Sequence, residues 1–224
     1  MSEVINEYEN IFNEIYGHDN IKKIFLRSIV SRKPVHILLT GSRGSGKSLF
    51  LEAIKKHLPN VYYADNNTTG PGMIEYLSTH PSIKYFCIDE IDKLDHSEQN
   101  VLLNVMESGI LRSTKVRKTF EMEMNLWIFA TANNVERLAR EMRSRFLIFH
   151  FKDFAYHNFL QTSQKLLMER FGYPMEFCWV IADQVWKKMK SNDIRDVIKI
   201  ATIASTPKDL DWVIETMESY SEGE

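Results

Sequence analysis

The residues from Gly41 to Ser48 constrain this chain more than any other stretch of its sequence. They match the pattern G-x-x-x-x-G-K-S and directly follow the apolar run 35–40. The glycines let backbone N–H groups turn inward toward a phosphate, and a helix that begins near Lys47 adds its positive dipole. Lys47 can reach the β- and γ-phosphates, and the Ser48 hydroxyl can bind Mg²⁺. The pattern therefore predicts a nucleoside triphosphate site, built from Gly41, Ser42, Arg43, Gly44, Ser45, Gly46, Lys47 and Ser48.

Short apolar runs alternate with amphipathic helical patterns as far as residue 151. The predicted strands are 35–40, 61–64, 84–88, 126–130 and 146–149. The predicted helices are 4–15, 21–29, 48–57, 71–80 and 97–107. Solid apolar strands separated by helices indicate a parallel sheet covered on both faces. We expect an α/β P-loop domain with five parallel strands over residues 1–151.

The strand patterns end after residue 151, and only helical patterns follow. They cover 153–170, 175–190, 192–205 and 207–220, with Gly172, Pro174 and Pro207 as breaks. We predict a second, all-helical domain over residues 152–224.

The composition excludes a surface built as a whole for nucleic acid, because 28 basic residues face 30 acidic ones. A local basic patch stays possible. Cys87 and Cys178 lie far apart, which favours a reducing compartment over a disulfide scaffold. No run approaches the roughly eighteen apolar residues of a membrane span, and the N-terminus lacks a signal pattern. We expect a soluble, cytoplasmic protein with no membrane segment.

Two acids end the third predicted strand. Asp89 and Glu90 follow Tyr85-Phe86-Cys87-Ile88, about 40 residues after the glycine-rich loop. At this end of a strand, Asp89 can hold Mg²⁺ while Glu90 activates the attacking water. A surface turn is the alternative, but the spacing from the loop favours catalysis. A nucleotide switch needs no such base, so Glu90 indicates a hydrolase.

The order of these motifs resembles the AAA+ ATPases. Asp89-Glu90-Ile91-Asp92 is similar to their Walker B motif, and Ala130-Thr131-Ala132-Asn133 is similar to their sensor 1. The resemblance implies that Asn133 positions water near the γ-phosphate, whereas the residues alone also allow a turn-forming Asn-Asn pair.

Arg143-Ser144-Arg145-Phe146 resembles the arginine-finger motif of the family. The resemblance implies that Arg145 serves the ATP of a neighbouring subunit, with Arg143 as the second choice. A solvated basic face is the alternative, because Arg137 and Arg140 lie nearby.

Two weaker motifs complete the resemblance. Asn192-Asp193-Ile194-Arg195-Asp196 is similar to sensor 2, which implies that Arg195 lies over the γ-phosphate. The alternative is a surface arginine at a helix that Ser191 or Asn192 caps. Tyr16 and Gly17 lie where the family contacts adenine. The resemblance implies ATP and Mg²⁺ as cofactors and self-association into a ring or partial ring, with a hexamer as the expected form.

An insertion at about 108–124 alternates as two short strands around a basic turn. Its place resembles the pre-sensor-1 β-hairpin of one AAA+ branch. Within that branch the chain is most similar to the ATPase core of RuvB branch-migration motors, and MoxR-type chaperones and MCM helicases carry comparable hairpins. The resemblance implies contact with DNA or a DNA-bound protein through the cations Arg112, Lys115, Arg117 and Lys118. A solvated turn and a docking point for an accessory protein are the alternatives.

Two functions fit these motifs. The first is a RuvB-like motor that remodels DNA or a DNA-bound complex. RuvB carries a C-terminal winged-helix domain for which this chain has no room, and we expect this to weaken the motor hypothesis. The second is a MoxR-like chaperone that remodels a protein client through the same hairpin. A regulatory ATP-bound scaffold is a third, against which Glu90 argues, because a scaffold needs no catalytic base.

Overall fold

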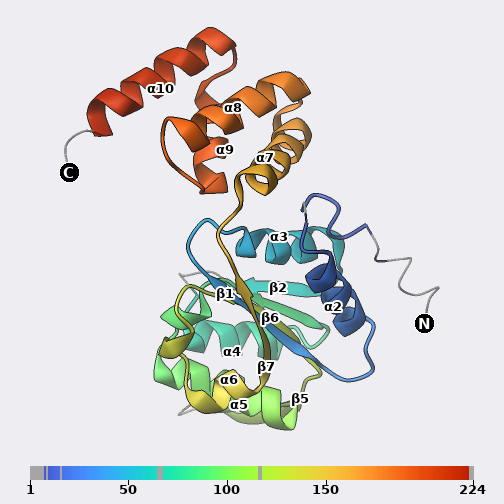
Figure 1. The fold of residues 1–224 in the computed structure, drawn as a ribbon. Coiled ribbons are helices and arrows are strands. Elements are labelled where there is room, and N and C mark those ends of the chain that lie inside the picture. Colours follow the sequence, from blue (N-terminus) through green and yellow to red (C-terminus); the bar gives the residue numbers. More distant parts are fainter. Residues whose placement is uncertain (1–7, 9, 16, 65–67, 116–117, 222–224) are drawn as a thin grey trace. The chain divides into compact units, whose positions relative to one another are not determined.

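The chain divides into two units, each with a hydrophobic core of its own. A computed structural model (Figure 1) describes residues 8, 10–15, 17–64, 68–115 and 118–221, without the side chains of 70, 112–120 and 221. The first unit comprises residues 1–12, 19–41 and 47–151, and the second comprises 13–18, 42–46 and 152–224. The assignment of 1–151 and 152–224 as separate domains stays a prediction.

A five-stranded parallel sheet forms the centre of the first unit. Its strands are β1 (His36–Gly41), β2 (Val61–Ala64), β3 (Tyr85–Ile88), β6 (Trp127–Ala132) and β7 (Phe146–Phe151). Their order is β2-β3-β6-β1-β7, and every neighbouring pair is parallel. Every residue of β1, β3 and β6 is buried, as expected for strands whose residues are apolar on both faces of the sheet. The predicted α/β fold is therefore confirmed, with strand ends within two residues of the expected ones.

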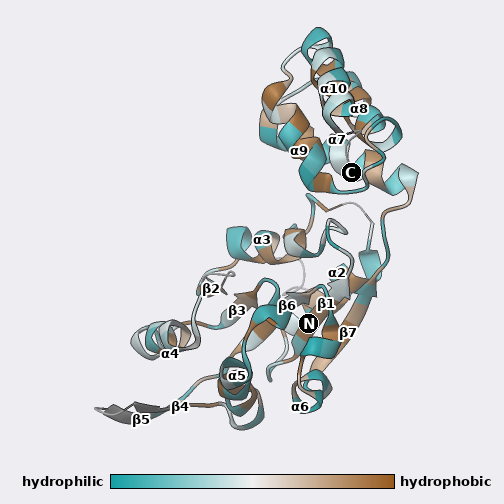
Figure 2. Cartoon of the chain, turned by 90° about the vertical axis from the view of Figure 1, so that its left-hand side faces the viewer, coloured by the Kyte–Doolittle hydropathy of each residue, from teal (hydrophilic) through white to brown (hydrophobic). Residues whose placement is uncertain are grey.

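Helices cover both faces of this sheet (Figure 1). α2 (Asp19–Ile29) and α3 (Lys47–His57) lie on one face, and α4 (Gly70–Thr79), α5 (His96–Ser108) and α6 (Arg140–Ser144) lie on the other. Figure 2 shows that the strands are mainly hydrophobic, whereas α5 and α6 present hydrophilic residues to the outside. This two-sided covering explains why the strand patterns are continuous rather than alternating.

Different side chains fill the two interfaces between sheet and helices. Phe12, Phe25, Phe50 and Phe129 form an aromatic cluster on the side of α2 and α3, with ring centroids 5.2–5.5 Å apart. On the other side, Phe86 and Ile128 belong to a cluster with aliphatic side chains of α4 and α5. Successive strand residues point to opposite faces, so Ile128 and Phe129 contribute to opposite interfaces.

α5 leads directly into the inserted hairpin. Its capping box is complete, because Asp95 Oδ1 accepts from the Glu98 backbone N–H and Glu98 Oε2 accepts from the Asp95 N–H. The helix ends at Ser108 with Gly109 as its C-cap, and β4 (Ile110–Lys115) and β5 (Lys118–Glu123) then pair antiparallel. Ile110 lies opposite Glu123 at the base of the hairpin. The turn residues 116–117, and with them Arg117, lie outside the described residues.

The C-terminal helices form the second unit. They are α7 (Tyr156–Phe171), α8 (Met175–Lys187), α9 (Ile194–Ile203) and α10 (Pro207–Ser221). Phe159, Ile181, Val197 and Leu210 are among the fully buried residues of their shared core. The predicted C-terminal helical region is thus present. Two 3-10 turns of the first unit, η1 (Ile91–Lys93) and η2 (Val135–Arg137), complete the described elements.

Of the first predicted helix, 4–15, residues 4–7 and 9 lie outside the described residues, and residues 10–14 form turns rather than a helix. Within the part of the chain that the structure describes, none of the helices combines the length and the apolar character needed to cross a bilayer.

Candidate functional site

The glycine-rich loop joins β1 to α3. Gly41 ends β1 with φ of +150°, and a Cβ there would lie 2.4 Å from the Phe151 carbonyl oxygen, so a larger residue does not fit. Gly46 has φ of +85°, the left-handed region that favours glycine. Lys47 is buried at the start of α3, and its Nζ donates to the Gly41 carbonyl at 2.9 Å. The ammonium therefore lies at the carboxyl end of β1 and at a helix N-terminus, where an anion site is expected.

Ser48 and Asp89 lie next to each other at the carboxyl end of the sheet. Ser48 Oγ donates to Asp89 Oδ1 at 3.0 Å, and Thr131 Oγ1 donates to the same oxygen at 2.5 Å. Tyr63 OH donates to Oδ2 at 3.4 Å. Burial, and then the charge of Asp89, raise the pKa of Tyr63, so this phenol stays protonated. A hydroxyl and a carboxylate side by side fit Mg²⁺, which takes one or two protein oxygens besides phosphates and water.

Glu90 follows in the left-handed conformation, with φ of 55° and ψ of 50°. A non-glycine residue there is strained and needs surroundings that hold it. Its backbone N–H donates to Thr131 Oγ1 at 2.9 Å, and Asn133 Nδ2 donates to its Oε1 at 2.8 Å. Its Oε2 forms an ion pair with Lys93 Nζ at 2.5 Å. The structure thus brings Glu90 and Asn133 together, and both carboxylate oxygens are held.

Asp92 anchors the segment that carries Asn133. Its buried carboxylate accepts from the backbone N–H groups of Asn133 at 3.2 Å and Asn134 at 3.0 Å. Thr131 and Asp92 stand inside the two motifs, yet the sequence assigned neither a role. The only signal for them was a third acid after Asp89-Glu90 and a hydroxyl residue before Asn133.

Arg145 lies at the end of the sheet opposite the loop of its own chain. It directly precedes Phe146, which pairs with His36 at the amino end of β1, whereas the loop begins at Gly41. Six strand residues span roughly 17 Å, which exceeds the reach of an arginine side chain. Burial, and then the charge of Arg145, lower the pKa of His36 to about 4, which agrees with this position.

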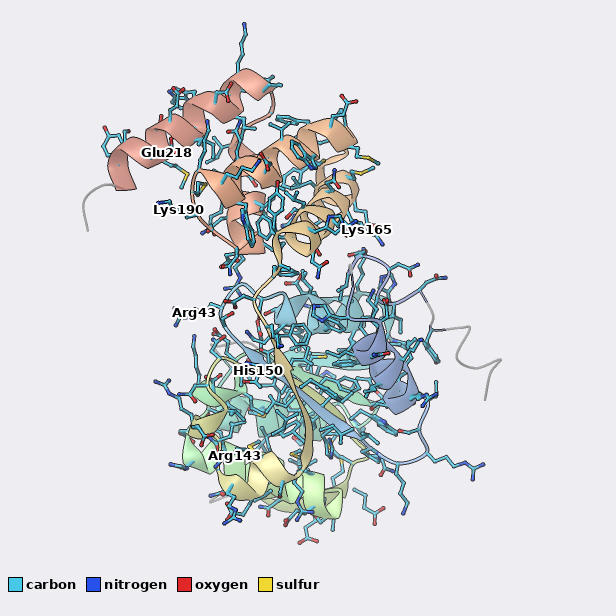
Figure 3. All side chains as sticks on the ribbon, in the orientation of Figure 1. Arg43, Arg143, His150, Lys165, Lys190 and Glu218 are labelled. Atoms are coloured by element: carbon cyan, nitrogen blue, oxygen red, sulfur yellow. The ribbon has the colours of Figure 1, made fainter. Side chains whose placement is uncertain are left out.

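Both arginines of the Arg-Ser-Arg segment pair with glutamates of the same unit. Arg143 Nη1 lies 2.8 Å from Glu136 Oε2, and Arg145 Nη2 pairs with Glu107 Oε1 at the end of α5. Arg143 lies on α6 (Figure 3). Neither glutamate was identified from the sequence.

The other predicted residues stay predictions. Tyr16 lies outside the described residues, and Gly17 adopts φ of +71°. Arg43 is exposed and extends outward (Figure 3). Arg195 is the second residue of α9 and is exposed. The cap of α9 is Asp193, whose Oδ1 accepts from the Arg195 N–H at 2.8 Å, rather than Ser191 or Asn192.

A protein-family model and the relatives that are similar in sequence both indicate the MCM family. The model of the MCM P-loop domain matches residues 3–145. The DNA replication licensing factor mcm7 of Schizosaccharomyces pombe is 29% identical over 160 residues, which are 57% of this chain and 21% of that protein. The factor mcm4-A of Xenopus laevis is 27% identical over 152 residues, which are 54% of this chain and 18% of that protein. The chain therefore spans about a fifth of the length of these relatives.

Among solved structures, a RuvB mutant of Thermotoga maritima has a TM-score of 0.63 at 17% identity, covering 86% of this chain and 64% of that one. The RuvB Holliday junction branch migration motor of the same organism has a TM-score of 0.60 at 16% identity, covering 84% and 61%. At such identities the likeness shows the fold alone. The expected likeness in fold to the RuvB ATPase core is confirmed, while the sequence matches point to MCM proteins.

Proposed function

Because this chain belongs to the MCM P-loop domain family, within the AAA+ ATPases, we propose that it hydrolyses ATP as part of an oligomeric ring. The observation that carries the proposal is the cluster of Ser48, Asp89, Glu90 and Asn133 at the carboxyl ends of β3 and β6. Ligands of α/β sheets bind at this edge, and the glycine-rich loop begins there, at the end of β1.

Some side chains at this site bind the nucleotide and the metal, and others take part in the hydrolysis. Lys47 holds the β- and γ-phosphates, while Ser48 and Asp89 hold Mg²⁺, which neutralises phosphate charge when bound. Glu90 accepts the proton of the attacking water. Asn133, 2.8 Å from Glu90 Oε1, orients both that carboxylate and the water.

A second subunit completes the site. Arg145 lies too far from its own loop to serve it, and an exposed guanidinium can instead reach the ATP of a neighbouring subunit. Arg143 is the second choice for this role. Arg195 reports the γ-phosphate from α9, and Tyr16 with Gly17 contacts adenine. The assembly is a ring or partial ring, with a hexamer as its expected form.

DNA or a DNA-bound complex is the proposed client. The relatives that match in sequence are called DNA replication licensing factors, and a structural neighbour is called a Holliday junction branch migration motor. The hairpin sequence 112–118 carries four cations, which suit phosphate contact. A cytoplasmic location fits this client. A MoxR-like action on a protein client is the alternative that the experiment below separates.

Steady-state ATP turnover across protein concentrations, with and without branched DNA, tests the proposal. We expect turnover per chain to rise with concentration, and DNA to stimulate it in a manner that falls with added salt. The double variant Lys115→Gln/Lys118→Gln should lose the stimulation by DNA. Lys188→Gln/Lys208→Gln removes the same charge from exposed positions of the second unit and serves as the control.

Two outcomes would change the proposal. Turnover that rises with concentration but ignores DNA would point to a protein client. Turnover that is absent at every concentration, in the presence of Mg²⁺ and DNA, would contradict ATP hydrolysis itself.

A further inference from the structure

Glu107 holds the one arginine that the proposed function requires between subunits. Its Oε1 pairs with Arg145 Nη2, and the two side chains are 41% and 43% exposed. A pair as exposed as this contributes little to folding stability, because water and salt screen it. We therefore expect the pair to fix the orientation of the Arg145 guanidinium rather than to stabilise the fold.

The donor geometry of arginine allows Glu107 to hold Arg145 without blocking it. A guanidinium carries five N–H groups in a planar fork, and the contact with Glu107 uses the Nη2 edge. The remaining N–H groups stay available to the phosphate of another subunit. An arginine that is already oriented loses less conformational entropy when it reaches that phosphate.

The position of Glu107 is itself well fixed. It lies in the last turn of α5, a helix with a complete capping box at one end and Gly109 in the left-handed conformation at the other. Val105, two residues earlier, is buried in the core beneath the sheet. α5 therefore offers a rigid support from which a carboxylate can direct Arg145.

We propose that Glu107 is a positioning residue that orients Arg145 toward the ATP of the neighbouring subunit. The proposal rests on the proposed action of Arg145 between subunits. The nearby pair of Arg143 with Glu136, at 2.8 Å, is an internal comparison, since it has the same chemistry two residues away.

Subunit mixing tests this role. Lys47→Ala chains cannot hold ATP but supply Arg145, and Arg145→Ala chains hold ATP but lack the arginine. A mixture should regain turnover only where a Lys47→Ala chain offers Arg145 to an Arg145→Ala neighbour. Glu107→Gln is then added either to the Lys47→Ala chain, which donates the arginine, or to the Arg145→Ala chain, which does not.

Placement decides the outcome. Glu107→Gln in the donating chain should lower the kcat of the mixture about tenfold or more and leave the KM for ATP unchanged, because only orientation is lost. The same substitution in the Arg145→Ala chain should have no effect, and Glu136→Gln in the donating chain should also have none.

Other results would overturn the inference in distinguishable ways. An equal loss from both placements would show a structural role for Glu107, and no loss from either would show no role. A loss with Glu136→Gln alone would move the role to Arg143. If the starting mixture without Glu107→Gln regains no turnover, the proposed action of Arg145 between subunits is refuted. The positioning role of Glu107, which rests on it, is then refuted as well.

Discussion

Acid should destabilise this protein through His36, the first residue of β1. The imidazole is buried, its ring stacks edge-on against Phe146, and its Nδ1 accepts from the Ile128 backbone N–H at 3.2 Å. Burial, and then the charge of Arg145, lower its pKa from 6.5 to about 4. Since the folded state resists protonation, the unfolded state binds more protons between these two values. The contribution of neutral His36 to the free energy of unfolding is therefore present above about pH 6.5 and is lost as the pH drops toward 4.

The expected loss follows from the pKa difference. At pH 5.0 an unfolded histidine is almost fully protonated while His36 in the fold is still mostly neutral. The free energy of unfolding should then be lower than at pH 7.5 by about 2 kcal/mol on account of this residue alone. The loss approaches about 3 kcal/mol once the pH falls below 4.

Urea unfolding followed by circular dichroism at pH 7.5 and 5.0 measures this loss. His36→Asn removes the titration but keeps an acceptor near the position of Nδ1, so its constant cost cancels between the two pH values. The wild type should lose about 2 kcal/mol more than His36→Asn. His150→Asn, at an exposed position of β7, should retain the wild-type pH dependence. Equal pH dependence of the wild type and His36→Asn would refute the argument.

Three further predictions concern the side-chain cluster for which we propose a catalytic role. Glu90→Gln should bind ATP and hydrolyse it very slowly in steady-state assays, and normal turnover would contradict its role as the base. Asp92→Asn leaves one oxygen for the N–H groups of Asn133 and Asn134, so kcat should fall about tenfold with ATP affinity unchanged in a titration; an unchanged kcat would remove Asp92 from the support of Asn133. Lys93→Met removes the ion pair with Glu90 Oε2 and should raise kcat by up to about fivefold, whereas a fall would mean that Lys93 assists the base.

Local features of the sequence were sufficient for the strands of the sheet and for the glycine-rich loop. The strands of the sheet are short solid apolar runs, and their period and length identify them without knowledge of their neighbours. Gly41 and Gly46 mark the loop because both have a positive φ that favours glycine, and at Gly41 a Cβ would also collide with the Phe151 carbonyl. The pattern over 4–15 was less informative, since residues 10–14 form turns although apolar residues recur at helical spacing.

The supporting side chains could not be found in this way, because their partners are distant in sequence. Thr131 bonds to Asp89 across 42 residues, Asp92 to the Asn133 N–H across 41, and Arg145 to Glu107 across 38. A threonine, an aspartate or a glutamate carries no sign of such a contact in its own neighbourhood. Their roles depend on which strands and helices lie side by side.

The sequence by itself determined that the chain carries a glycine-rich loop after one strand, two acids after a buried strand and an asparagine after another, because these depend on local backbone chemistry. Only the tertiary structure decided that they meet. β6 lies between β3 and β1 in the sheet, so the ends of three strands that are separate in the sequence share one edge. The same parallel register places Arg145 at the opposite edge, since it precedes a strand whereas the loop follows one.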